Sequence, residues 1–343
     1  LYSKNDLPID AIISPEQEVA KAFHRRIISP GTIDMVELSE KQLKLIGFKC
    51  NNNCDHIGLT VRELSAKFPD YLANILFIFR GDKKFIVNSS SKIEKDDLIY
   101  MVVETQNLKD VLREFGHKEV QAQKIVIIGG GNIGFSLAEL IEKNDNGIST
   151  ELIEMNKERA EFIASNLNNV TVTNGDGLDN QILDEVNIAE AGYCLAVTED
   201  DEVNVLASLL AKRAGTNQCM ALINNSSYTS LLSNIGIDIT IDPKLITISK
   251  ILEKVRGGGI MSDYSLGDGF GEVIEAMIKK QSPLCNKNLK ELNLPKSIRI
   301  ASILRDNKII IPNSNTVFKE NDDVVFFAET QYINTLEKLL SSY

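Results

Sequence analysis

Two stretches of this chain occur twice, about 225 residues apart. Residues 9–15 (IDAIISP) resemble residues 237–243 (IDITIDP), and residues 78–83 (IFRGDK) resemble residues 303–308 (ILRDNK). This spacing is far longer than the period of a solenoid repeat, so it indicates duplication of a unit that holds two domains. A glycine-rich loop precedes the second copy and has no counterpart before the first, so we expect one and a half units of a tandem array.

Changes in the hydrophobic pattern divide the chain into five segments. We expect a strand and a helix from a first nucleotide domain (1–34), a small α+β domain (35–116), a polar linker (117–123), a nucleotide domain (124–259) and a second small α+β domain (260–343). Pro15 is typical of a helix start, which predicts a helix after the strand at residues 9–13. Strands alternate with helices from Lys124 onward, which predicts an α/β fold with a Rossmann-type, doubly wound parallel sheet and two small α+β domains.

A glycine-rich loop directly follows the first strand of the predicted parallel sheet. Its residues are Gly129, Gly130, Gly131, Asn132, Ile133 and Gly134. In a G-x-G-x-x-G loop the first glycine allows the tight turn, the second lets a pyrophosphate approach the backbone, and the third lets the helix pack on the strand. The loop therefore predicts a dinucleotide site at a helix N-terminus.

Further candidate ligand contacts lie where later strands end. Glu154 closes the second strand, 20 residues after Gly134, where a carboxylate can accept hydrogen bonds from a ribose diol. This carboxylate favours NAD(H) over NADP(H), but ATP and ADP carry the same diol. Asp176 is a candidate for the adenine edge or for a turn, Thr198 and Glu199 end the fourth strand, and Ile223 is a candidate apolar wall. For the acidic pair at residues 200–201, complementing a helix dipole is the favoured interpretation.

The residues expected of a dehydrogenase do not accompany this loop. Moving the proton that accompanies a hydride requires an acid or a base. The three histidines, His24, His56 and His117, all precede the loop in the sequence, and Cys194 falls within a strand that we expect to be buried. The pattern predicts a nucleotide receptor without a catalytic residue.

Composition and net charge narrow the classes of protein to which this chain could belong. A net charge of −11 argues against a nucleic-acid partner, which would require a basic face. Five cysteines, an odd number, fit a reducing cytoplasm, and no apolar run approaches the roughly 20 residues of a membrane span. Cys50, Cys54 and His56 form a C-x3-C-x-H group that lacks a fourth metal ligand nearby, so a surface turn is favoured over a metal site.

Taken together, the motifs resemble those of the RCK (KTN) domains that regulate potassium transport. The resemblance lies in the start KIVIIGGGNIG (124–134), LIE (152–154), GDG (175–177) and AVTEDDEVN (196–204), and in the duplicated small domain. It identifies the parallel domain as an RCK N-lobe and the small domains as two RCK C-lobes.

The resemblance also implies a function. Such chains are peripheral subunits of Trk-type potassium uptake systems, which bind NAD(H), and also ATP or ADP, without turning them over. They form homo-oligomeric dimers or tetramer rings on the cytoplasmic face of a TrkH- or TrkG-like membrane subunit. The implied nucleotide contacts are the loop from Gly129 to Gly134, Glu154 and Thr198–Glu199, with Asp176 near the adenine, and Gly257–Gly259 is a candidate hinge whose alternative is a helix terminator.

Two other functions remain open at this stage. One is an NAD-dependent oxidoreductase with an unrecognised substrate domain, and the other is an RCK regulator of another cation transporter. The duplication favours a ring-forming regulator over the enzyme, because a substrate domain need not occur twice.

Overall fold

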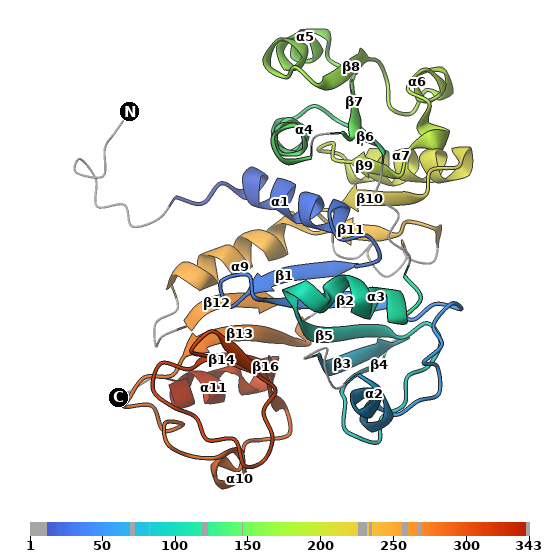
Figure 1. Ribbon diagram of the computed structural model, residues 1–343. Coiled ribbons are helices and arrows are strands. Elements are labelled where there is room, and N and C mark those ends of the chain that lie inside the picture. Colours follow the sequence, from blue (N-terminus) through green and yellow to red (C-terminus); the bar gives the residue numbers. More distant parts are fainter. Residues whose placement is uncertain are drawn as a thin grey trace, which may run out of the picture. The chain divides into compact units, whose positions relative to one another are not determined.

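The computed structural model describes residues 12–340, except 69–72, 82, 118–122, 146, 226–231, 233–234, 256–259 and 267–268. The chain divides into two compact units (Figure 1). Residues 1–28 and 120–248 form one, called here the parallel unit, and residues 29–119 and 249–343 form the other, called the small-domain unit.

The parallel unit is built on a six-stranded sheet in the order β11-β10-β9-β6-β7-β8, in which every pairing is parallel. Its strands are β6 (Lys124–Ile128), β7 (Ser149–Glu154), β8 (Val170–Asn174), β9 (Tyr193–Ala196), β10 (Gln218–Leu222) and β11 (Ile239–Ile241). The connecting helices are α4 (Asn132–Asn144), α5 (Lys157–Asn166), α6 (Asn180–Glu185) and α7 (Asp201–Ala214), and α9 (Pro243–Val255) follows β11. Counted along the chain, this is the doubly wound strand order 3-2-1-4-5-6, so the predicted Rossmann-type sheet is confirmed.

Helix α1 (Pro15–Ile27) begins at the proline that predicted it. Its apolar face buries Val19 and Phe23 in the same core as Leu137 and Ile141 of α4, and His24 Nε2 lies 2.5 Å from Asp145 Oδ2. The structure therefore groups this helix with the parallel sheet that follows it in the chain. Of the strand expected at residues 9–13, residues 9–11 lie outside the described part, and residues 12–13 form no strand.

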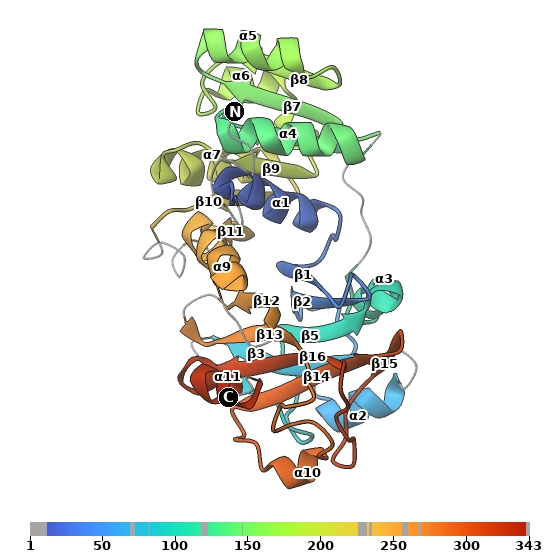
Figure 2. The same ribbon diagram turned by 90° about the vertical axis from the view of Figure 1, so that its left-hand side faces the viewer.

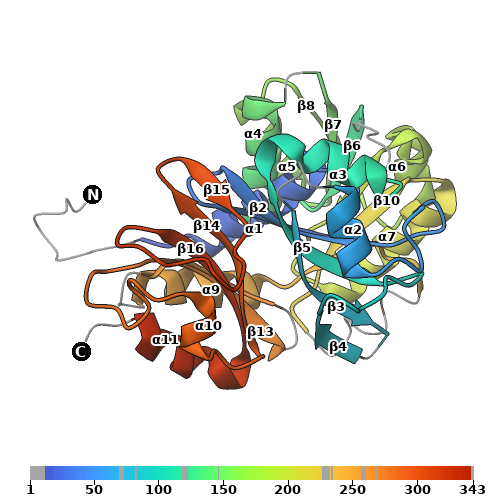
Figure 3. The same cartoon turned by 60° about the horizontal axis from the view of Figure 1, so that its bottom comes forward.

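The small-domain unit contains two five-stranded antiparallel sheets with equivalent strand orders, β1-β2-β5-β3-β4 and β12-β13-β16-β14-β15. The first sheet comprises β1 (Asp34–Leu38), β2 (Leu43–Lys49), β3 (Asn74–Arg80), β4 (Lys83–Ile86) and β5 (Leu98–Glu104), with helices α2 (Val61–Lys67) and α3 (Leu108–Glu114). The second comprises β12 (Ile260–Ser265), β13 (Gly271–Met277), β14 (Ile298–Arg305), β15 (Lys308–Ile310) and β16 (Asp323–Glu329), with helices α10 (Leu289–Leu292) and α11 (Ile333–Leu340). Figure 3 shows the second sheet in orange and red with its two helices. The repeated small α+β plan is thus confirmed.

Side chains of each central strand alternate between two cores, as the two-residue period of a strand requires. In β5, Met101 and Val103 face the helices of their own domain, whereas Tyr100 and Val102 point the other way. The inner faces of the two sheets meet in one apolar cluster, in which the Phe77 and Phe327 ring centroids lie 4.7 Å apart. The packing of the two antiparallel sheets against each other can be followed in Figure 2. In each small domain the helices cover one face of the sheet. The two domains pack against each other through the opposite faces and so form one unit.

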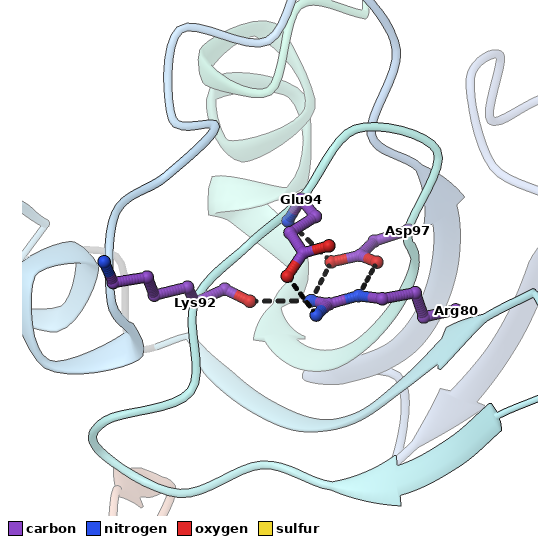
Figure 4. A network of polar contacts seen from close by, with 4 residues as sticks. All are labelled: Arg80, Lys92, Glu94 and Asp97. Atoms are coloured by element: carbon purple, nitrogen blue, oxygen red, sulfur yellow. Dashed lines mark hydrogen bonds and ion pairs between the residues drawn. The ribbon is translucent and has the colours of Figure 1, made fainter.

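The duplication extends to a buried ion pair in each sheet. Arg80 donates from Nε and Nη2 to both oxygens of Asp97, at 2.7 and 2.8 Å, and also bonds Glu94 and the Lys92 carbonyl (Figure 4). At the equivalent place, Arg305 donates to both oxygens of Asp322 at 2.6 and 2.7 Å and to the Val317 carbonyl. Asp97 and Asp322 are fully buried, and such two-pronged pairing satisfies a buried carboxylate.

Two sequence-based expectations concern other parts of the chain. The candidate hinge at Gly257–Gly259 lies outside the described residues. Among the residues that are described, no helix is long and apolar enough to cross a membrane.

Candidate functional site

The glycine loop joins β6 to α4 at the carboxyl edge of the parallel sheet. In the sheet order, β6 lies between β7 and β9, so successive crossovers from β6 run in opposite directions. Ligands of open α/β sheets bind at this reversal, outside the carboxyl ends of the strands. The predicted loop is therefore at the position where a ligand crevice is expected.

Two of the glycines are required by the geometry of the turn. Gly129 has a φ of +106°, a conformation that side chains disfavour, and its amide donates to the Ile153 carbonyl at 2.9 Å. A Cβ added at Gly134 would lie 1.9 Å from the Gly129 carbonyl oxygen. These residues fit the roles that the motif predicts for its first and third glycines.

Gly131 differs, because apart from its neighbours in the chain no atom of the described residues lies within 4 Å of where its Cβ would be. Gly131 is the N-cap of α4, and no side chain in the described part of the chain caps that helix end. Gly131 and Asn132 are exposed, and Ile133 is partly buried against the core. The first backbone amides of a 13-residue helix thus face open space beside a residue without a side chain, which suits an anionic group.

Glu154 holds the loop in place. Its Oε2 accepts from the Gly130 amide at 2.7 Å, and its Oε1 accepts from the Asn156 amide at 2.7 Å. A Cβ on Gly130 would lie 2.8 Å from this carboxylate and 2.4 Å from Ile163 Cδ1. The carboxylate predicted to bind a ribose therefore also fixes the second loop residue, and each oxygen retains acceptor capacity.

The sequence analysis did not single out Arg159, which closes the other side of the loop. Its Nε donates to the Gly130 carbonyl at 2.7 Å, and Nη2 donates to the Gly131 carbonyl at 3.3 Å. The guanidinium also lies over the rings of Phe135 and Phe162, 5.5 and 5.0 Å from their centroids. Arg159 brings a positive charge beside the open amides, where it would favour a phosphate.

The end of β9 is organised by Asn204, a second residue that was not singled out. Asn204 Oδ1 accepts from both the amide and the hydroxyl of Thr198 at 2.8 Å, while Nδ2 donates to the carbonyls of Thr198 and Leu222. This buried amide connects β9 to β10, and Thr198 lies directly against Gly129. Glu199, next in the chain, is exposed. Thr198 and the loop are thereby held side by side.

The remaining candidates have local structural roles. Asp176 is exposed and accepts from the Leu178 amide at 2.9 Å, whereas Asp179 caps the following helix. Ile223 is almost completely buried in a small apolar cluster, so a ligand would reach it only if its covering residues moved.

Of the acidic pair at residues 200–201, only Asp200 has the helix-capping role that the helix-dipole interpretation expects. Asp200 caps α7 and accepts a hydrogen bond from the Val203 amide. This hydrogen bond lowers the pKa of the Asp200 carboxyl. Asp201 accepts from the backbone amides of Asn224 and Asn225 at 2.8 Å each.

None of the three histidines belongs to the glycine loop or to the strand ends beside it. His24 pairs with Asp145 at the carboxyl end of α4, whereas the loop is at the amino end of that helix. His56 and His117 belong to the small-domain unit, and Cys194 is completely buried in β9. Within the described ranges, no group of three or more His, Cys, Asp or Glu residues could hold a metal ion.

Comparison with known proteins identifies the family. The TrkA-N domain model matches residues 125–243, and the TrkA-C domain model matches residues 273–341. The Trk system potassium uptake protein TrkA of Azorhizobium caulinodans is 37% identical over 339 residues, which cover 99% of this chain and 74% of that protein. The chain belongs to the TrkA family. The TrkA protein of Vibrio alginolyticus is 32% identical over 343 residues, with the same coverage of each chain.

Solved structures support the fold of this TrkA family member. The RCK domain of GsuK superposes with a TM-score of 0.53 at 15% identity, covering 96% of this chain and 70% of that one. The GsuK channel bound to NAD gives a TM-score of 0.51 at 15% identity, over 96% of this chain and 58% of that one. The resemblance to RCK domains inferred from the motifs is thus confirmed at the level of the fold.

Proposed function

We propose that this chain is a nucleotide-binding regulatory subunit that gates a membrane potassium uptake transporter and leaves its nucleotide unchanged. The observation that carries the proposal is the open space beside Gly131, at the uncapped N-terminus of α4. Pyrophosphate oxygens at this place would meet backbone amides and the nearby Arg159 guanidinium. The side chains described around the loop serve to shape it, and none of them is a histidine.

The ligand proposed is NAD(H), with ATP or ADP as adenine nucleotides that present the same diol. Glu154 supports this choice, because its carboxylate ends β7 beside the loop and would repel the 2′-phosphate of NADP. Among proteins of the same fold, the GsuK channel has been solved bound to NAD. The contacts proposed are Gly129–Gly134, Glu154, Thr198 and Glu199, with Asp176 and Ile223 at the edge of the site.

The membrane partner proposed is a potassium-translocating subunit of the TrkH or TrkG kind, with this chain peripheral on the cytoplasmic face. The support is the family, whose members carry the name of the Trk potassium uptake system. We propose the domain division given above, in which the N-lobe at 124–259 binds nucleotide and the C-lobes at 35–116 and 260–343 pair. A dimer or tetramer ring follows from the same resemblance.

Nucleotide can gate the transporter only if its affinity differs between two states of the assembly. This requirement yields a direct assay. In liposomes that contain the assembled transporter, NADH and NAD should change potassium flux in opposite directions or to different extents. Equal fluxes with and without every nucleotide would contradict regulation.

Binding itself is tested by calorimetric titration of the purified chain with NADH, NAD, ATP and ADP. Gly131→Ala places a methyl group in the open space without disturbing a neighbour, since its φ of −61° suits any residue. We expect its affinity to fall by about tenfold or more, equivalent to about 1.4 kcal/mol. Asn144→Ala is the control, because this exposed, uncharged residue lies at the opposite end of the same helix and should leave the affinity unchanged.

The nucleotide recovered after titration separates the regulator from an oxidoreductase. Intact NADH after incubation with a panel of small metabolites supports a sensor. Steady NADH consumption that Gly131→Ala abolishes would instead establish an enzyme. Reconstitution with other cation transporters distinguishes the potassium system from a related antiporter.

A further inference from the structure

The C-x3-C-x-H group forms a tight turn at the end of β2. Cys50 is fixed by backbone bonds to the segment before β5, donating to the Asp97 carbonyl at 2.7 Å and accepting from the Asp96 amide at 2.8 Å. The Cys54 amide then bonds the Asn51 carbonyl at 3.1 Å. This turn brings Cys54 back beside Cys50, and their thiols are hydrogen-bonded to each other. The surface turn favoured from the sequence is therefore wrong for the thiols, since Cys50 is 0% exposed and Cys54 is 5% exposed.

The two thiols differ in acidity because of their surroundings. The Cys50 thiol and the backbone amides of His56 and Ile57 donate to the Cys54 sulfur, which lowers the pKa of Cys54 to about 7. The pKa of Cys50 is raised, because its proton is held by Cys54 and because the thiol is buried. A thiolate is the reactive form of cysteine, so Cys54 is the nucleophile of the pair and Cys50 is its neighbour within reach.

His56 does not complete a metal site with these thiols. Its ring packs against Phe68 and Phe115, with centroids 5.1 and 5.2 Å away, and its Nε2 lies 3.6 Å from Glu114 Oε2. No cluster of three or more potential ligands, this one included, is formed by the described residues. What the fold brings together is a pair of sulfur atoms in one turn, at the edge of one apolar core.

We propose that Cys50 and Cys54 form a redox-sensitive dithiol, which a peroxide oxidises to an intramolecular disulfide. The Cys54 thiolate attacks one peroxide oxygen, the O–O bond breaks, and Cys54 becomes a sulfenic acid as hydroxide leaves and takes up a proton. The Cys50 sulfur then attacks the Cys54 sulfur, its proton passes to the departing hydroxyl group, and water leaves. In total, two thiols and one hydrogen peroxide give one disulfide and two waters, with two electrons passing to the peroxide.

The position of the turn gives the oxidation a structural consequence. Asn53 packs so closely on Gly116 that a Cβ there would lie 2.3 Å from the Asn53 carbonyl oxygen. Gly116 follows α3, immediately before the segment that leads to β6 of the parallel unit. Disulfide formation draws the sulfur atoms to about 2.05 Å and so constrains the turn against which this end of the domain rests.

A second thiol pair in the same chain provides an internal control. Cys194 and Cys219 are directly opposite each other on the parallel strands β9 and β10, and their thiols are also hydrogen-bonded. Both are completely buried, and the bond from Cys219 together with burial raises the pKa of Cys194 well above its usual value. This pair should remain reduced under conditions that oxidise Cys50 and Cys54.

The test is mass spectrometry of the full chain after brief treatment with hydrogen peroxide near neutral pH, followed by alkylation of the remaining thiols and trypsin digestion. We expect the peptide covering residues 50–62 to lose about 2 Da and to regain it after reduction with a thiol. Cys194 and Cys219 should be recovered as thiols. Absence of the disulfide from the 50–62 peptide, or equal oxidation of the β9–β10 pair, would overturn the proposal.

Two variants assign the roles of the thiols. Cys50→Ser should leave a sulfenic acid on Cys54 that dimedone traps, whereas Cys54→Ser should abolish both the disulfide and the dimedone adduct. Cys285→Ser, at the half-buried cysteine of the second small domain, serves as the control and should not change the disulfide. A dimedone adduct on Cys50 in the Cys54→Ser variant, or no adduct on Cys54 in the Cys50→Ser variant, would refute the assignment, and circular dichroism of the reduced variants checks their folding.

Discussion

Replacing Asp323 with asparagine should remove much of the pH dependence of stability in the small-domain unit. Asp323 begins β16 on the inner face of its sheet, with 7% of its surface exposed. Its closest charged neighbour is Glu275 of β13, which accepts from the Ser39 amide and the Ser262 hydroxyl at 2.6 Å each. Burial, followed by the Glu275 charge, raises the pKa of Asp323 to about 7. Glu40 adds a smaller repulsion from the turn between β1 and β2.

The sign of the effect follows from proton binding. The unfolded carboxyl loses its proton near its usual pKa of 3.8, whereas the folded one keeps it to about pH 7. Between these values the folded state binds more protons, so the free energy of unfolding falls as pH rises and then levels off above pH 7. Three pKa units correspond to about 4 kcal/mol, and solvent screening at a partly wetted position reduces the expected change to about 2–3 kcal/mol.

An asparagine side chain at this position cannot ionise, and its amide can still donate to Glu275. In urea unfolding followed by circular dichroism, Asp323→Asn should therefore be more stable than the unmodified chain at pH 8 and similar to it at pH 5. Glu320→Gln, at an exposed position shortly before β16, is the matched control and should leave the profile unchanged. If Asp323→Asn lowers stability at pH 8, or retains the original difference between pH 5 and pH 8, the reasoning is refuted.

Three other substitutions test the loop and the ion pairs. Gly134→Ala should cost about 3 kcal/mol or prevent folding of the parallel unit, because its Cβ would meet the Gly129 carbonyl at 1.9 Å; a melting temperature within a degree of the parent would contradict this. Asn204→Ala leaves buried groups at the ends of β9 and β10 without partners and should cost about 2–3 kcal/mol in urea unfolding, and Asn204→Asp should cost at least as much, because a buried carboxylate oxygen would then face the Thr198 and Leu222 carbonyls. Arg305→Ala removes two donors from the buried Asp322 carboxylate, which keeps only the Lys319 amide, and should cost about 3 kcal/mol in urea unfolding at pH 7; a loss below about 0.5 kcal/mol would argue against the ion pair.

Patterns within a short stretch of sequence predicted most of the fold. The unbroken β-branched run at 124–128 predicted a buried parallel strand, and the 225-residue offset predicted that two small domains would share one plan. These predictions succeed because strand burial and strand order depend on local periodicity and on repetition. The glycine loop could also be predicted from a short stretch of sequence, because the positive φ at Gly129 and the close approach at Gly134 are properties of the turn itself.

Contacts between distant segments could not be predicted in this way. The sequence predicts a helix that begins at Pro15, but the core that buries Phe23 is formed by residues more than 100 positions away. Arg159 and Asn204 were not singled out, because each lies in the first turn of a helix, where polar residues are common. Their importance comes from hydrogen bonds to distant segments: Arg159 bonds the glycine loop, and Asn204 bonds the end of β9. The Cys50 and Cys54 thiols are buried although their turn is rich in asparagine, because that turn folds back onto a domain core.

The duplicated sheets share their strand order but differ where their inner faces carry polar groups. Gly47 of β2 is paired with Tyr100 of β5, and the glycine makes room for the tyrosine ring, whose hydroxyl bonds Asp34 at 2.6 Å. At the equivalent positions the second sheet has Glu275 on β13 and Val325 on β16. The larger side chain of the pair therefore lies on β13 in the second sheet, but on β5 in the first. The space between the paired strands is filled in both sheets. At these positions, however, only the second sheet carries a carboxylate. Gly47→Glu alone should not be tolerated in the first sheet, because its Cβ would lie 2.7 Å from the Tyr100 ring. A Gly47→Glu, Tyr100→Val double variant that is more stable than the Gly47→Glu single variant would show that the two positions are coupled in their packing.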